Sequence, residues 1–137
     1  MRSAVLDTNV VVSALLQPAG PPAAIIELGF GRQFRWYVSA PIWAEYAAVL
    51  ERKKLAVDPR EATDFFKDLR RVAVFVVPKR TLRECSDASD NKFLECALAA
   101  RADFVVTGNV RHFPARFQDV RIIQPRQFLT ILAAESR

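Results

Sequence analysis

The sequence has few residues that can build a zinc site or a disulfide framework. Its 137 residues include two cysteines, Cys85 and Cys96, and a single histidine, His112. Their number and positions match no familiar spacing of metal ligands. We therefore interpret the cysteines as reduced thiols of a cytosolic protein.

Long apolar runs are also missing. No segment approaches the roughly 18 or more apolar residues of a membrane-spanning helix, and the amino-terminal residues have the pattern of a strand, without that of a signal peptide. No part of the chain is rich enough in Pro, Gly, Ser or Gln to indicate disorder. We expect a cytoplasmic protein without a membrane segment, in which residues 1–137 fold as a single domain.

Positive charge, by contrast, is in excess. Twenty Lys and Arg against fifteen Asp and Glu give a net charge of +5, and the isoelectric point is about 9.7. Such a surplus favours anionic partners, of which nucleic acid is the first candidate. Many soluble proteins carry a similar surplus for solubility alone, so charge by itself leaves both interpretations open.

Short apolar segments alternate along the chain with segments of helical period. Strands are predicted at residues 3–6, 34–38, 72–77, 104–106 and 121–123. Helices are predicted at 9–16, 23–30, from Ser39 to about Lys53, from Asp58 to about Arg71, after Asp90, and at 126–134, with loops at 17–22 and 79–89. This alternation predicts an α/β fold with a mostly parallel sheet covered on both faces.

Four polar positions lie where such a sheet places its functional loops. Asp7 and Asn109 each come just after a predicted strand, Glu45 lies one turn into a helix, and Asp90 stands at a helix start. Two of them also have purely structural explanations. Asp90 can serve as the N-cap of its helix, and Glu45 as a first-turn carboxylate favoured by the helix dipole.

Asp7 is harder to explain by structure alone. A carboxylate that follows a buried strand loses hydration unless something pairs with it, and a metal ion is a natural partner for several carboxylates. Thr8 and Asn9 can orient that carboxylate, although a plain Asx-turn would use the same residues. Oxygen ligands suit Mg²⁺ or Mn²⁺, and such an ion could assist the hydrolysis of a phosphodiester.

The order and spacing of these residues resemble those of the PIN-domain family. More narrowly, the chain looks like the prokaryotic PIN proteins that are toxins of toxin–antitoxin systems, relatives of the VapC toxins. The resemblance covers essentially the whole chain. It is carried by Val5–Leu15, by Glu45 between Ala44 and Tyr46, by Asp87–Ala97 and by Val106–Asn109.

The resemblance implies a three-layer α/β/α fold with a central parallel sheet, and Mg²⁺- or Mn²⁺-dependent endonucleolytic cleavage of RNA. Asp7, Glu45 and Asp90 match the acidic metal-binding positions, and Asn109 matches a fourth position that is usually Asp. Thr107 matches the hydroxyl residue that braces the turn before Asn109. Asp87 matches a further acidic residue and is a supporting candidate, as are Thr8 and Asn9.

The resemblance also implies partners, namely a second copy of the chain in a homodimer and a small antitoxin protein. Five aromatic residues are candidates for exposed interface positions: Phe30, Phe34, Trp36, Trp43 and Tyr46. Helical spacing favours the protein core for Trp43 and Tyr46.

Two positions depart from the family pattern. Asn109 leaves the site one negative charge short, which weakens metal binding and makes a second ion less favourable. His112 stands where many relatives carry another acidic residue. We interpret it as a loop residue near the site, because a metal-activated water needs no separate histidine base.

Three other functions are compatible with part of this pattern. A PIN-fold module that binds RNA or protein without cleavage is favoured by the missing charge at Asn109. Covalent phosphotransfer on Asp7, as in the haloacid dehalogenases, expects a second Asp where this chain has Asn9. A dinucleotide-binding fold is disfavoured, because no G-x-G-x-x-G follows the first strand.

Overall fold

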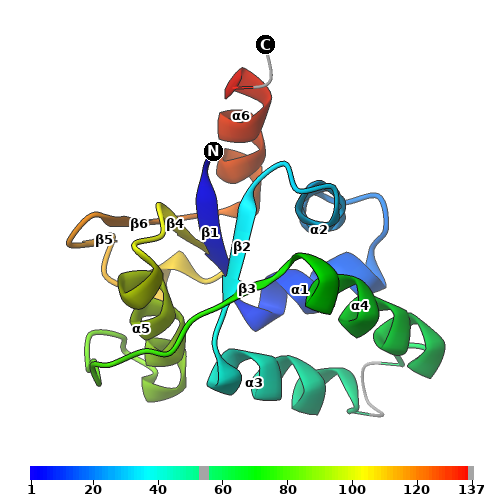
Figure 1. Ribbon diagram of the computed structural model, residues 1–137, viewed down its shortest axis with the longest axis horizontal. Helices are drawn as coiled ribbons and strands as arrows, with labels where there is room; N and C mark the ends of the chain where they lie inside the picture. Colours follow the sequence, from blue (N-terminus) through cyan, green and yellow to red (C-terminus); the bar gives the residue numbers. More distant parts are fainter. Residues whose placement is uncertain (53–55, 136–137) are drawn as a thin grey trace.

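The computed structural model describes residues 1–52 and 56–135. Within these ranges six strands form one sheet in the order β3-β2-β1-β4-β6-β5 (Figure 1). Neighbouring strands are parallel except for the antiparallel pair β5 and β6. The strands are β1 (Ser3–Leu6), β2 (Arg35–Val38), β3 (Val74–Phe75), β4 (Phe104–Val106), β5 (Arg116–Phe117) and β6 (Val120–Ile123). The predicted α/β fold with a mostly parallel sheet is confirmed.

Helices cover both faces of this sheet (Figure 1). They are α1 (Thr8–Leu16), α2 (Pro21–Phe30), α3 (Ala40–Leu50), α4 (Pro59–Val72), α5 (Asn91–Ala100) and α6 (Pro125–Glu135), with short 3₁₀ turns η2 (Ala88–Asp90) and η3 (Val110–His112). Helix α5 packs on β1, β2 and β4, whereas α2 contacts α1, α4 and α6 on the other side. No single described helix is long and apolar enough to span a membrane. Helices α1 and α2 reach the required length and composition only when taken together, and the pair is bent by 103° at its break.

One predicted helix boundary is wrong, and another falls outside the described residues. Pro21 and Pro22 do not belong to the preceding loop, since they begin α2, where a proline costs no hydrogen bond because the first helical N–H groups have no partner. The helix that follows Ser39 ends at Leu50, and its predicted end near Lys53 lies outside the described residues.

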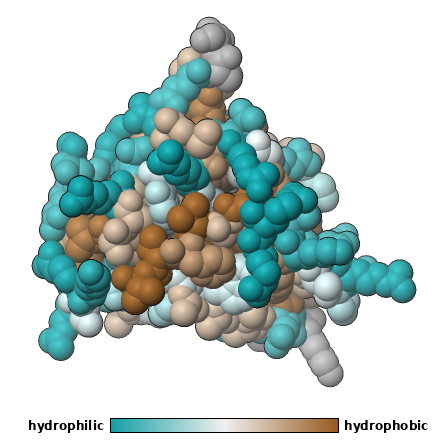
Figure 2. Space-filling model, viewed as in Figure 1, coloured by the Kyte–Doolittle hydropathy of each residue, from teal (hydrophilic) through white to brown (hydrophobic). Residues whose placement is uncertain are grey.

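The predicted strand at residues 72–77 is largely wrong. Helix α4 continues to Val72, and only Val74 and Phe75 pair with β2. This short edge strand leaves apolar side chains in solvent, with Phe75 50% and Val77 82% exposed. Figure 2 shows the resulting apolar patch on this face of the molecule, over β3.

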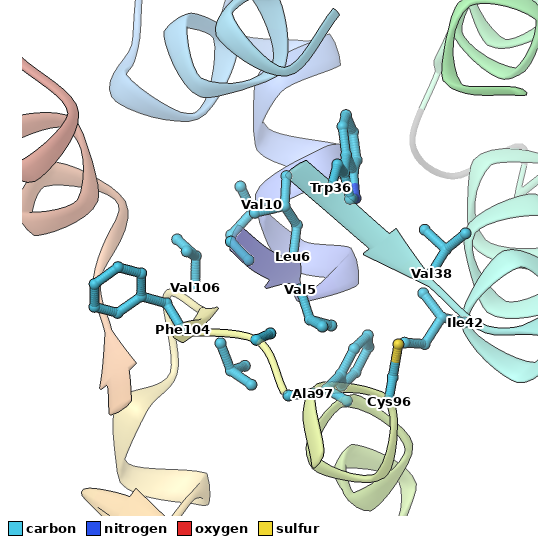
Figure 3. Packing of buried hydrophobic residues seen from close by; sticks show 14 of the residues in the cluster. Val5, Leu6, Val10, Trp36, Val38, Ile42, Cys96, Ala97, Phe104 and Val106 are labelled. Carbon is cyan, nitrogen blue, oxygen red and sulfur yellow. The ribbon is translucent and has the colours of Figure 1, made fainter. Parts of the chain in front are cut away.

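The core lies on both sides of β1 and β2 (Figure 3). Phe34, Trp36 and Tyr46 are fully or almost fully buried, so the suggestion that they form an exposed interface is wrong, while core placement of Tyr46 is confirmed. Phe30 is partly buried and stacks on Trp36. Trp43 is also partly buried, and the Arg70 guanidinium lies 5.0 Å from its ring centre.

Tyr46 ties α3 to the carboxyl end of β1, because its buried hydroxyl donates a hydrogen bond to the carbonyl of Leu6. Tyr46→Phe should lower the free energy of unfolding by about 1–2 kcal/mol, since it leaves a buried carbonyl without this donor. Tyr37→Phe removes a hydroxyl from the partly buried Tyr37 of β2, which makes no such bond to any described residue, and is the matched control. Urea denaturation tests both, and equal effects of the two variants would contradict the assignment.

Candidate metal centre

The first and fourth strands meet at the point where the strand order of the sheet reverses. From β1 the chain passes to β2 on one side, and it later returns to β4 on the other side. Leu6 and Val106 are register partners, and the Asp7 amide donates to the Val106 carbonyl at 2.9 Å. Asp7 and Thr107 are therefore the first residues after two neighbouring strands and lie side by side, in the crevice where open α/β sheets bind ligands.

Three donors hold the Asp7 carboxylate, which is only 6% exposed. The Thr107 hydroxyl donates to Oδ2 at 2.7 Å, the Asn9 amide side chain to Oδ2 at 3.3 Å, and the Asn9 backbone N–H to Oδ1 at 3.5 Å. Asp7 is thus the N-cap of α1, as an Asx-turn explanation requires. The shortest of the three bonds, however, comes from Thr107 in another strand.

Thr107 also fixes the next turn, since its Oγ1 accepts the Asn109 backbone N–H at 3.0 Å. The Gly108 N–H donates to Asn9 Oδ1 at 3.2 Å. These bonds bring the backbone of Asn109 close to Asp7. The Asn109 side chain itself is exposed and has no described partner.

Glu45 is not a first-turn carboxylate. It lies in the second turn of α3, whose first turn holds no acidic residue, so the explanation from the helix dipole is wrong. Its two oxygens contact the Thr8 hydroxyl and the Lys92 ammonium, and its side chain is 25% exposed. Glu45 therefore faces the start of α1 and the first turn of α5.

Asp90 occupies the N-cap position of α5, but its side chain makes no capping hydrogen bond. The geometry therefore does not support the explanation that the Asp90 carboxylate caps the helix. Instead, Oδ2 of Asp90 lies 3.4 Å from Nδ1 of His112. The loop residue His112 is thus a direct neighbour of Asp90.

Asp87 and Asn91 shape the loop that carries Asp90. The exposed Asp87 accepts bonds from the backbone and side chain of Ser89 at 2.9 and 2.8 Å, and these bonds lower the pKa of Asp87. The buried Asn91 accepts the N–H groups of Glu84 and Cys85 at 3.1 and 3.0 Å. Sequence reasoning missed Asn91, for which a polar residue on the inner face of a helix is the only signal.

The three carboxylates influence one another through their charges. Burial raises the pKa of Asp7 to about 6, the charges of Asp90 and Glu45 add to this, and the Thr107 bond opposes it. Burial is also the main cause of the raised pKa of Asp90. Clustered carboxylates with raised pKa values are short of positive charge, which a bound cation supplies.

The donor set suits a hard divalent cation. Asp7, Glu45 and Asp90 offer oxygens only, and Mg²⁺ keeps several waters while using one or two protein carboxylates. Within residues 1–52 and 56–135, no three His, Cys, Asp or Glu side chains form a ready-made metal-binding group. Because Glu45 already faces the positive charge of Lys92, whereas the donors to Asp7 are neutral, Asp7 and Asp90 are the carboxylates better placed for a metal ion.

Thr107→Val should lower the free energy of unfolding by about 2–3 kcal/mol, because it removes a bond to a buried carboxylate and an acceptor for the Asn109 N–H. Thr107→Ser keeps the hydroxyl and should lose less than about 1 kcal/mol. Urea denaturation in EDTA at pH 7 measures both values. Equal losses would mean that the methyl group of Thr107, and not its hydroxyl, matters.

The chain belongs to the PIN domain family, whose model matches residues 3–111. An uncharacterized protein of Methanocaldococcus jannaschii is 32% identical over 108 residues, which are 77% of this chain and 69% of that protein. Among solved structures, the crystal structure of VapBC2 from Rickettsia felis bound to a DNA fragment from their promoter superposes with a TM-score of 0.59. That match covers 89% of this chain and 98% of the other at 15% identity, so it establishes a shared fold.

Proposed function

We propose that this PIN-domain protein is a metal-dependent endoribonuclease. One observation carries the proposal: a buried carboxylate, Asp7, lies at the switch point of the sheet and is coupled by charge to Asp90 and Glu45. Membership of the PIN domain family supports the reaction class. In this proposal residues 1–137 act as one domain.

The proposed metal-binding positions are Asp7, Glu45, Asp90 and Asn109, and the proposed ion is Mg²⁺ or Mn²⁺. Such an ion supplies Lewis-acid activation of water and neutralises charge that develops on the phosphodiester. The chain's own contribution is orientation. Thr107 and Asn9 fix both oxygens of Asp7, and Asp87 holds the loop before Asp90.

The proposed RNA binding is supported by the overall charge of the chain and by a hollow near the turn that follows Asn109. The chain carries a net charge of +5, and a hollow of about 430 Å³ lies next to the turn that follows Asn109. Its polar lining includes Arg111, Gln124 and Gln127. Arginine positions a strand through its phosphates, while amide side chains can contact bases or sugars.

The direct test is incubation of a labelled single-stranded RNA with the purified protein in Mg²⁺, in Mn²⁺ and in EDTA. We expect internal cleavage products with either ion and none in EDTA. Cleavage that survives EDTA would contradict metal dependence, and the absence of cleavage with both ions would contradict the nuclease assignment.

A PIN-fold module that binds RNA without cutting it is the second candidate. It is favoured by the exposed Asn109 side chain, which contributes no charge, and by Lys92, which already neutralises Glu45. Retention of intact RNA by the wild-type chain in Mn²⁺, measured by gel shift, would select this alternative.

We further propose that the nuclease is the toxin of a toxin–antitoxin pair and forms a homodimer. The solved structure with the same fold is a VapBC2 assembly from Rickettsia felis, and this likeness supports the biological context. Induced expression in a bacterial host should arrest growth for the wild type and not for Asp7→Asn. The mass in solution, from light scattering, tests the dimer.

A further inference from the structure

Lys92 brings a positive charge into the carboxylate cluster. Its ammonium contacts Oε1 of Glu45, and the Thr8 hydroxyl donates to Oε2 of the same carboxylate. Both oxygens of Glu45 therefore have partners from the chain itself. The side chains of Lys92 and Glu45 are only 22% and 25% exposed, so solvent ions screen this pair less than a surface pair.

The first turn of α5 delivers two opposite charges to one place. Asp90 precedes the helix and Lys92 is its second residue, and the Lys92 ammonium lies over the Phe93 ring, with Nζ 5.9 Å from the ring centre. Asp90 is coupled by charge to both Asp7 and Glu45. Lys92 therefore enters the same cluster that Asp90 helps to form.

The charge of the cluster matches that of one divalent ion. Asp7, Glu45 and Asp90 carry three negative charges when ionised, and Lys92 cancels one of them, which leaves two. Asn109 adds none. Without Lys92 the third negative charge, that of Glu45, would have no cationic partner and would be open to a second metal ion.

We propose that the Lys92 ammonium takes the place of a second divalent cation at Glu45, so that this chain binds one metal ion, held by Asp7 and Asp90. The inference rests on the proposed metal-dependent function and fixes how many ions the site takes. Lys92 is a positioning residue that acts through Glu45. Glu45 lines the site, but the Lys92 ammonium already neutralises its charge.

Calorimetric titration of the metal-stripped protein with Mn²⁺ tests the number of ions. We expect one ion for the wild type and two for Lys92→Met, because that change leaves a half-buried carboxylate without its cation. Lys92→Arg keeps the charge and should bind one ion. Lys67→Met removes an exposed lysine of α4 and should also bind one.

Two further variants distinguish the loss of the Lys92 charge from a loss of folded structure. Lys92→Gln keeps a polar contact with Glu45 without the charge and should bind two ions, and Glu45→Gln added to Lys92→Met should return the number to one. Circular dichroism establishes that each variant is folded. Two ions in the wild type, or one ion in both folded neutral variants, would overturn the role of Lys92 and leave the proposed nuclease standing. No binding by the wild type would overturn both.

Discussion

Asp7→Asn is expected to lower RNA cleavage by at least about 100-fold while raising the free energy of unfolding of the metal-free protein at pH 7.5. The loss follows from the proposed role of Asp7 as a metal ligand. The gain follows from burial, because the folded state holds a carboxylate whose pKa is about 6 instead of 3.8. A shift of this size corresponds to as much as about 3 kcal/mol.

The sign of the pH dependence is fixed by the direction of this shift. Asp7 binds its proton more tightly in the folded state, so its ionisation destabilises the fold as pH rises from about 4 through about 6. Asp7→Asn should therefore match the wild type below pH 4 and exceed it above pH 6. Thermal melts in EDTA measure the difference, and added Mn²⁺ should stabilise the wild type alone. A less stable Asp7→Asn at pH 7.5 would contradict the raised pKa.

Phe93→Ala should lower the free energy of unfolding by about 3–5 kcal/mol, a large share of the total for a domain of this size. Phe93 is fully buried on α5, directly after Lys92 and in the same first turn of the helix. The truncation leaves a cavity where α5 packs on the sheet. Urea denaturation measures the loss.

Phe75→Ala is the matched control, because Phe75 is half exposed on the edge strand β3. It should cost about 1 kcal/mol, mainly through its contact with Trp43. Equal losses for the two phenylalanines would show that the packing of α5 does not anchor this part of the fold.

The sheet was predictable wherever local pattern and tertiary structure agree. The strands β1 and β4 are buried on both faces and, apart from Ser3, consist of consecutive apolar residues, which period analysis detects. Strand β5 has only two residues, and its hairpin with β6 turns at Gln118 with a φ of 53°. A strand of two residues, Arg116 and Phe117, is too short for an alternating or continuous apolar pattern, so the sequence does not distinguish it from a loop.

The boundary between α4 and β3 shows where local preference fails. Val72–Val77 is rich in β-branched residues, yet α4 runs through Val72. The helical period of the preceding residues and the basic Arg70 and Arg71 in the last turn favour continuation of the helix. Strand β3 pairs with the last two residues of β2, Tyr37 and Val38, after which the chain of β2 passes into α3 and offers no further partner to the ladder.

The partners of the acidic residues were the least predictable part of the candidate site. The contact between Glu45 and Lys92 joins residues 47 apart in sequence, and the one between Glu45 and Thr8 joins residues 37 apart. Neither pair has a local signature. Asp7 was recognisable because a carboxylate directly after a buried strand is unusual, whereas Lys92 looks like any polar residue in a helix.

The most direct measurement is the rate at which one labelled single-stranded RNA is cut in Mn²⁺ by the wild type, by Asp90→Asn and by Asp64→Asn. Asp64 is an exposed carboxylate on α4 and controls for the change in net charge. We predict cleavage by the wild type and by Asp64→Asn at equal rates, with at least about 100-fold less by Asp90→Asn. Equal cleavage by Asp90→Asn and the wild type would contradict a catalytic centre at these carboxylates.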